Sequence, residues 1–552
     1  MLAAGSMMAL ILSSHAARAD DAGIQKLEAE IQRIEALHQS QIHALQSEIK
    51  QLRHEQVVIR SAPISTIKGE PGPGAPFVTE TPNHHFGLSS ADGLNTIELT
   101  GRLHLDTGGY LDYTPNALTT DQKGLANGVN LRRARIGVVG KWMGDWSYAL
   151  IYDFGGNTDT LNPALLLQNA NTTNTSNNSY SAVSGVENAF ITYNGFYNHG
   201  QKYPIAIDAG FQDVPWTLDE ATSSNDIMFM ERSSSQVVAT QFGGGDFRSA
   251  LGVRSNDNRY WIGAYLTGPT AGSLATDGAA CVSGTPPCIP AASVSGYGPS
   301  ASGLFRASYQ LVQTKDATVH LGFNYANMFG PRVGANDAGV QLYDRPELRV
   351  DPSYFLNTKA IPARDAQVFG AEAAASYGPA FVQGEYYHYL VDTTAGTSVV
   401  GVSSITGGGG LTGGAPGPVA DFNGGYAEAS YSFGGQRKYR PATGSYTGVI
   451  PDAPFEWATG GLGALEVASR FSIVDLNSGG LQELAKAKTG YTAYTGSEQT
   501  SYGVGLNWYP NTNMRFMLDY EHVIVSNPAK FGGPSVTGTK VDWVASRVQF
   551  NF

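Results

Sequence analysis

The chain has 552 residues, of which 15% are charged, with 67 glycines, 28 tyrosines and a formal net charge of −12. After the first twenty positions it contains no run of eighteen apolar residues, which excludes a membrane-spanning helix. The acidic balance argues against nucleic acid as a partner, because a phosphate-binding surface needs an excess of basic residues.

The N-terminus has the features of a secretory signal peptide. A short apolar core at residues 7–12 precedes residues 17–19, which carry the small-x-small pattern of a cleavage site. We therefore expect residues 1–19 to be a signal peptide and the mature protein to be exported.

Residues 20–60 are predicted to form a helical coiled-coil head. Apolar residues recur there at steps of mostly three and four, as in a coiled coil, namely Ile24, Leu27, Ile31, Ile34, Leu37, Ile42, Leu45, Ile49 and Leu52. So narrow a seam predicts self-association, and isoleucine at both core positions favours three strands. The alternative is a lone solvated helix packed on the rest of the chain. Residues 61–94, rich in proline and glycine, are expected to be a linker.

The region 95–552 is dominated by alternation of apolar and polar residues. The alternation runs without a break over fifteen residues from Ile97, longer than a strand of an ordinary soluble protein. Similar segments recur and predict sixteen strands, near 96–113, 130–143, 145–156, 184–196, 203–213, 237–254, 259–268, 302–313, 316–328, 366–377, 379–391, 424–434, 463–476, 499–509, 512–525 and 540–552. Strands of about ten residues with one charged face are typical of a membrane barrel with a wet interior.

The connections between these strands alternate in length. Those after even-numbered strands are mostly short turns and those after odd-numbered strands are long, with residues 435–462 as the exception. Short periplasmic turns and long external loops are typical of outer-membrane barrels, and the last strand alternates down to the terminal Phe552. We expect an all-β fold, a 16-stranded antiparallel transmembrane β-barrel in the outer membrane of a Gram-negative bacterium. The coiled-coil head would lie in the periplasm.

Other chemistry finds little support in the sequence. Cys281 and Cys288, with two prolines between them, are expected to form a disulfide that closes a loop of an exported protein. Further metal ligands near these cysteines are lacking, and the histidines lie in no nucleophile motif. We therefore predict no cofactor, no metal and no enzymatic activity. A surface adhesin or a structural anchor of the outer membrane is the alternative to a pore.

Four segments resemble the phosphate-selective porin O and P family: 131–154 (LRRARIGVVGKWMGDWSYALIYDF), 214–233 (VPWTLDEATSSNDIMFMERS), 464–476 and 502–522. The resemblance implies a homotrimer of sixteen-stranded barrels whose third external loop, near 214–236, folds inward and narrows the pore. The family often has a basic residue in the strand that enters this loop, where this chain has Asp213. The loop adds Asp219, Glu220, Asp226 and Glu231 against Arg232, and these acids argue against strict phosphate selectivity, because a carboxylate repels phosphate oxygens.

Alternation places a set of basic residues on the inner face of the barrel, where they would line the pore: Arg102, Arg133, Arg135, Lys141, Arg248, Arg254, Arg306, Arg470 and Arg515. One interpretation is that they face the acidic loop across a wet constriction, with Asp213 and Glu220 opposite Arg133 and Arg135. The other is that several pair with inward acids, namely Glu98, Asp106, Asp153, Glu372, Glu466 and Asp519. Either way we expect a water-filled channel in outer-membrane lipid for small polar or charged solutes, among which ions, phosphate and other anions are candidates.

Overall fold

The computed structural model describes residues 29–30, 32–33, 77–80, 86–114, 125–155, 185–199, 204–243, 247–270, 301–333, 337–351, 354–358, 361–394, 416–458, 460–487, 497–526 and 539–552. The chain divides into two compact units, residues 1–70 and 71–552. In the first unit the described residues are helical. The signal peptide, all nine apolar residues of the coiled-coil seam and the cysteine pair lie outside the described residues and stay predictions. No helix of the described part of the chain is long and apolar enough to cross a membrane.

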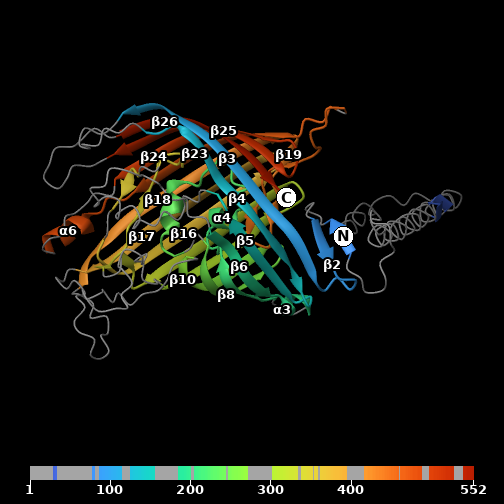
Figure 1. Ribbon diagram of the computed structural model, residues 1–552, viewed down its shortest axis with the longest axis horizontal. Helices are drawn as coiled ribbons and strands as arrows, with labels where there is room; N and C mark the ends of the chain where they lie inside the picture. Colours follow the sequence, from blue (N-terminus) through green and yellow to red (C-terminus); the bar gives the residue numbers. More distant parts are fainter. Residues whose placement is uncertain are drawn as a thin grey trace, which may run out of the picture. The chain divides into compact units, whose positions relative to one another are not determined.

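The second unit is built around a closed antiparallel barrel (Figure 1). Its sixteen strands are β3 (Thr96–Thr114), β4 (Gly128–Trp142), β5 (Trp146–Asp153), β6 (Gly185–Tyr193), β7 (Ala206–Gln212), β8 (Arg248–Asn256), β9 (Tyr260–Thr270), β10 (Ala301–Gln313), β11 (Ala317–Phe329), β16 (Ala363–Tyr377), β17 (Ala380–Thr394), β18 (Pro416–Phe433), β23 (Ala464–Asp475), β24 (Glu498–Tyr509), β25 (Met514–Ser526) and β26 (Thr539–Asn551). Each pairs with its neighbour in the chain order, and β26 pairs with β3. The predicted sixteen-stranded barrel is therefore confirmed.

Smaller elements lie before the barrel and in its connections. They are the strands β1 (Phe77–Glu80), β2 (Phe86–Ser89), β12 (Arg332–Val333), β13 (Asp337–Ala338), β14 (Tyr343–Asp344), β15 (Leu356–Asn357), β19 (Gly435–Gln436), β20 (Tyr439–Arg440), β21 (Ser445–Tyr446) and β22 (Ile450–Pro451), and the helices α3 (Gly195–Asn198), α4 (Leu218–Ala221), α5 (Ser234–Thr240) and α6 (Gly479–Ala487).

Two predictions about these regions need correction. The expected linker 61–94 contains a hairpin, because β1 pairs with β2 and β2 pairs with the start of β3. The strand expected over 237–254 begins only at Arg248, since residues 234–240 form helix α5. Ser233 caps this helix by accepting a hydrogen bond from the Gln236 amide, and the apolar residues that suggested a strand are packed in the barrel interior instead.

The two faces of the barrel wall differ as alternation predicts. Outward positions are apolar and exposed, for example Leu99, Leu251, Phe323 and Val467, which suits contact with lipid. Aromatic residues gather at the turn end, where Trp146 packs on Tyr193 and Trp508 stacks on Phe516. Many inward positions are polar or charged yet buried, because long connections fold back and cover them.

The barrel closes at its last residue. Gly101 and Phe552 exchange both backbone hydrogen bonds, at 2.9 and 3.1 Å. A Cβ added at Gly101 would lie 2.2 Å from the ring of Phe552. The ring of Phe552 therefore needs a glycine beside it, and Gly101 in the first barrel strand provides the space.

Candidate pore constriction

The connection between β7 and β8, residues 213–247, is termed the constriction loop. It contains the short helices α4 and α5, and most of its described residues are buried. Thr217 caps α4 by accepting a hydrogen bond from the Glu220 amide at 3.0 Å. The loop contacts β17, β23, β25 and β26 through the hydrogen bonds given below, so it crosses the barrel interior as the resemblance implies.

Carboxylates hold the amide groups of this loop. Glu385 on β17 accepts hydrogen bonds from the amides of Leu218 and Asp219, both at 2.9 Å. Asp519 on β25 accepts one from Met230 at 2.8 Å. Each carboxylate compensates buried N–H groups that would otherwise be costly to leave unpaired.

Arginines of the wall hold the carbonyl groups of the same loop. Arg515 donates to the carbonyl oxygens of Ile227 at 2.7 Å and Met228 at 3.1 Å. Arg470 donates to the carbonyl oxygen of Glu231 at 2.8 Å. Arg306 donates to Pro215 at 3.2 Å. These side chains point inward as predicted, but the loop covers them, so they fix its main chain.

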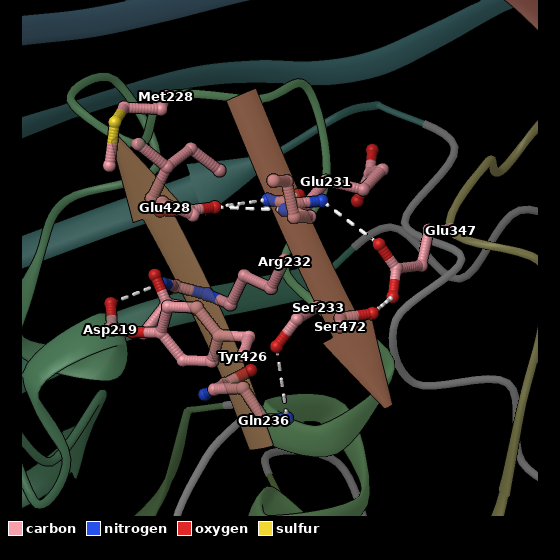
Figure 2. Close-up of polar contacts among 12 residues, drawn as sticks. Asp219, Met228, Glu231, Arg232, Ser233, Gln236, Glu347, Tyr426, Glu428 and Ser472 are labelled. Carbon is pink, nitrogen blue, oxygen red and sulfur yellow. Dashed lines mark hydrogen bonds and ion pairs between the residues drawn. The ribbon is translucent and has the colours of Figure 1, made fainter. Parts of the chain in front are cut away.

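Arg470 is also the centre of a buried ion-pair network. It lies 2.7 Å from Glu428, its direct partner across the β18–β23 pair, 3.1 Å from Glu347 and 3.3 Å from Glu521. Its guanidinium stands 4.3 Å from the ring centre of Phe229. Figure 2 shows Glu347 facing Ser472, with which it is hydrogen-bonded. Glu347 also accepts a hydrogen bond from the Ser234 amide at 2.9 Å, and so links the β11–β16 connection to helix α5.

A second buried network surrounds Glu231. Its carboxylate lies 2.8 Å from Arg132, 3.0 Å from Arg547 and 3.2 Å from Arg349. Burial alone would raise the pKa of Glu231, but the arginines outweigh it and hold the pKa well below its usual range. Arg547 in turn forms a bidentate pair with Asp106 across the β26–β3 seam.

A β-bulge explains how Arg132 reaches this network. The register of β3 and β4 shifts so that His104 faces Arg133 while Leu105 faces Leu131, which leaves Arg132 as the extra residue. Both arginines are therefore buried on the inner face. Strict alternation would place Arg132 towards lipid, and the charge of two consecutive arginines in a membrane strand was the signal for a bulge.

The exceptional long turn between β18 and β23 also folds into the barrel. We term residues 435–451 the inward turn; they form two small strand pairs, β19–β22 and β20–β21. Arg437 binds Glu466 at 2.7 Å and donates to the carbonyl oxygen of Asp226 at 2.6 Å. Arg440 lies 3.0 Å from the Asp226 carboxylate. The constriction loop is thus contacted by a turn from the other end of the barrel.

A different group of ion pairs reaches water. Arg254 is 21% exposed and its partner Asp208 only 3%; Arg232 is 16% exposed and Asp219 only 6%. Figure 2 shows Asp219 and Arg232 facing each other. The arginine side chain is also more exposed than its acidic partner in the pairs Arg135–Asp153 and Arg440–Asp226. In each pair the arginine side chain is thus more exposed than its acidic partner.

The remaining predicted residues lie on the inner face or beside these networks. Arg102 donates to the hydroxyls of Ser223 at 3.1 Å and Ser224 at 2.5 Å. Arg133 lies 3.3 Å from a ring nitrogen of His104. Lys141 is exposed near the turn end of β4 and Arg248 is half-buried at the loop end of β8. Asp213, at the start of the constriction loop, contributes to the charge around Arg232.

Of the expected opposition of Asp213 and Glu220 to Arg133 and Arg135, the contacts below concern Glu220 and Arg135, and the part between Asp213 and Arg133 stays a prediction. Arg135 binds Asp153 and Glu187, and Glu220 lies 3.7 Å from Arg232. The interpretation in which inward arginines pair with acids therefore holds for several of them, including Arg306 with Glu372 at 2.9 Å. Among the described residues, no group of His, Cys, Asp and Glu is arranged to hold a metal ion.

A family model described as phosphate-selective porin O and P matches residues 97–552. The chain belongs to this family. Porin O of Pseudomonas aeruginosa is 23% identical over 465 residues, which cover 81% of this chain and 87% of that porin. An uncharacterized protein of Caulobacter vibrioides is 25% identical over 471 residues, or 83% of this chain and 75% of that protein.

Solved porin structures resemble the barrel more distantly. OmpT of Vibrio cholerae has a TM-score of 0.42 at 11% identity and covers 83% of this chain and 99% of its own. An anion-selective porin from Comamonas acidovorans has a TM-score of 0.39 at 11% identity, and the match covers 83% of this chain and 100% of that porin. By its family and its barrel, this porin is an outer-membrane channel for small solutes rather than a member of an enzyme family.

Proposed function

We propose that this porin passes small polar and charged solutes with a modest preference for anions. The observation that carries the proposal is the order within the water-facing ion pairs. At Arg135, Arg232, Arg254 and Arg440 the arginine side chain is more exposed than the acidic side chain with which it pairs. A solute that passes these pairs meets positive charge first, although the whole chain is acidic.

The same pairs limit how strong the preference is. Each guanidinium is already paired with a carboxylate, and that of Arg232 also donates to the carbonyl oxygens of Asp219 and Thr222. Fewer of its N–H groups are therefore free to bind phosphate in the bidentate manner. Charge in the buried networks is also compensated within a few ångströms, as at Arg547 and Asp106. A weak, general preference for anions fits this arrangement better than a tight phosphate site.

The test is the reversal potential of the purified full-length porin in a planar bilayer under a KCl gradient. We expect the reversal potential to shift modestly towards the equilibrium potential of chloride. The shift should be larger at low salt, because screening is weaker there. Phosphate added in the millimolar range should reduce the chloride current only slightly. A cation-selective pore would refute the proposal, and a strong block by phosphate would refute its weak character.

We also propose that the porin assembles as a homotrimer, as the family resemblance implies. Strands β5, β6 and β7 have 8, 9 and 7 residues, whereas β16, β17 and β18 have 15, 15 and 18. A tilted membrane strand needs about nine to eleven residues, so this short wall is suited to contact with other copies. Crosslinking of the purified porin followed by mass measurement should give a limit of three chains.

A further inference from the structure

An exposed apolar finger follows the inward turn. It comprises residues 453–462, of which 453–458 and 460–462 are described, and the bridge between Glu456 and Gly461 closes its tip. Trp457 is 89% exposed and Leu462 is 76% exposed. In Figure 1 the orange chain beside β19 extends past the ends of the neighbouring strands. Large apolar side chains that are so exposed at the rim of a barrel indicate a surface that contacts lipid or another protein.

The base of the finger lies on the lipid-facing wall. The ring of Phe455 meets the ring of Trp508 edge-on at 5.5 Å, and the Phe455 amide donates to the carbonyl of Pro510 at 2.6 Å. Trp508 in turn donates from its indole nitrogen to the carbonyl of Leu462 at 2.9 Å. These contacts attach both arms of the finger to the end of β24.

Trp508 belongs to the outward face of the wall. It stands opposite Phe516 on β25, and their rings stack at 5.3 Å. Leu506 and Leu518, the next outward pair, are exposed in the same direction. The finger thus continues the apolar surface that the barrel presents to lipid, at the level of the short turns.

We propose that the finger 453–462 is a membrane foot, which inserts Trp457 and Leu462 into the phospholipid leaflet at the turn end of the barrel. An indole ring suits this position, because its apolar body fits among the acyl chains and its N–H reaches the headgroup region. The proposal rests on the outer-membrane barrel and is independent of which ions the pore prefers.

The experiment measures tryptophan fluorescence of the full-length porin in vesicles of phosphatidylethanolamine and phosphatidylglycerol. Part of the lipid is replaced by phosphatidylcholine with brominated acyl chains, which quench only tryptophans in contact with lipid. The emission of Trp457 is the difference between the wild type and Trp457→Phe. Trp142→Phe gives a reference on the exposed wall, and Trp216→Phe gives one for a tryptophan buried in the interior.

We expect bromine near the headgroup to remove most of the Trp457 emission, bromine near the chain end to remove less, and neither to affect Trp216. Quenching by acrylamide should be weak for Trp457. Strong quenching by acrylamide without an effect of bromine would mean that the finger stands in water and would overturn the proposal. Quenching by neither would mean that protein covers the finger, such as a second copy or the N-terminal head, and would overturn it as well.

Discussion

Arg470 on β23, Arg515 on β25 and Arg547 on β26 are covered by the constriction loop, whereas Arg135 on β4 and Arg254 on β8 are partly exposed. Arg470 and Arg547 are buried together with their carboxylates. Arg135 and Arg254 are more exposed than theirs. The comparison teaches that arginine has two roles in one barrel. Where loops cover it, it holds backbone and carboxylates in place. Where it is partly exposed, we propose that it sets the charge that a solute meets.

The largest expected effect comes from removing an arginine that the constriction loop covers. Arg470→Met leaves Glu428, Glu347 and Glu521 buried without their shared cation. Removal of one partner from a buried ion pair costs about 3–5 kcal/mol. We expect a large loss of stability, measured as the temperature at which the purified barrel changes mobility in a detergent gel. The matched control is Arg440→Met on the water side, whose more exposed pair with Asp226 should contribute at most about 1 kcal/mol.

An effect of similar size, but confined to the loop rather than the whole barrel, is expected at the anchor of the constriction loop. Glu385→Leu leaves the amides of Leu218 and Asp219 without their acceptor, at a cost of about 1–3 kcal/mol for each buried group. The loop should become looser, which single-channel recordings would register as larger current fluctuations and more frequent closures. Glu385→Gln keeps one acceptor oxygen and should behave closer to the wild type. Equal noise in all three proteins would argue against Glu385 as an anchor.

On the water side, charge changes should alter selectivity more than stability. Arg254→Gln removes the positive charge of a partly exposed side chain and leaves Asp208 with its hydrogen bonds from Thr192 and Tyr265. We expect the reversal potential to move towards cations by about a twofold change in permeability ratio, and less at high salt. Combining Arg135→Gln with Arg254→Gln should shift the reversal potential further in the same direction. A reversal potential that stays in place at low salt would show that these arginines do not face the solute path.

The smallest expected effect is a pH dependence from acids of the loops. Burial raises the pKa of Asp219 and of Asp344 to about 6, against the opposing charges of Arg232 and Arg349. Both carboxyls are charged at pH 7 and neutral at pH 5, so acidification removes negative charge and should increase the preference for anions. Because these pKa values lie above the ordinary 3.8, the two groups lower stability as pH rises from about 4 through 6. The double variant Asp219→Asn and Asp344→Asn should reduce both pH effects; unchanged curves would contradict the assignment.

The sequence predicts the barrel wall far better than its contents. Alternation marks a wall strand such as β25 because each position faces either lipid or the interior. Arg547 was missing from the predicted inward residues, although it alternates with the outward residues of the last strand, and the register brings it opposite Asp106. Alternation carries no information on whether an inward residue is covered, because cover depends on the path of loops distant in sequence.

The inward turn illustrates that limit. Its unusual length was visible, but Arg437 and Arg440 lie in no strand pattern and their partners Glu466 and Asp226 are far from one another in the sequence. The bulge at Arg132 was missed for a local reason, since one extra residue reverses the facing of everything that precedes it. Helix α5 was missed because Val237 and Val238 favour a strand until a cap and packing decide otherwise.

The seam between β3 and β26 has a consequence for the order of events during biogenesis. Arg547 and Asp106 are separated by 441 residues, and Phe552 pairs with Gly101 in the first strand of the barrel. Contacts so distant along the chain form slowly, because a long loop must be closed first. None of these contacts can exist while the chain is still emerging from the ribosome. The seam can therefore form only after strand β26 has been synthesised and released.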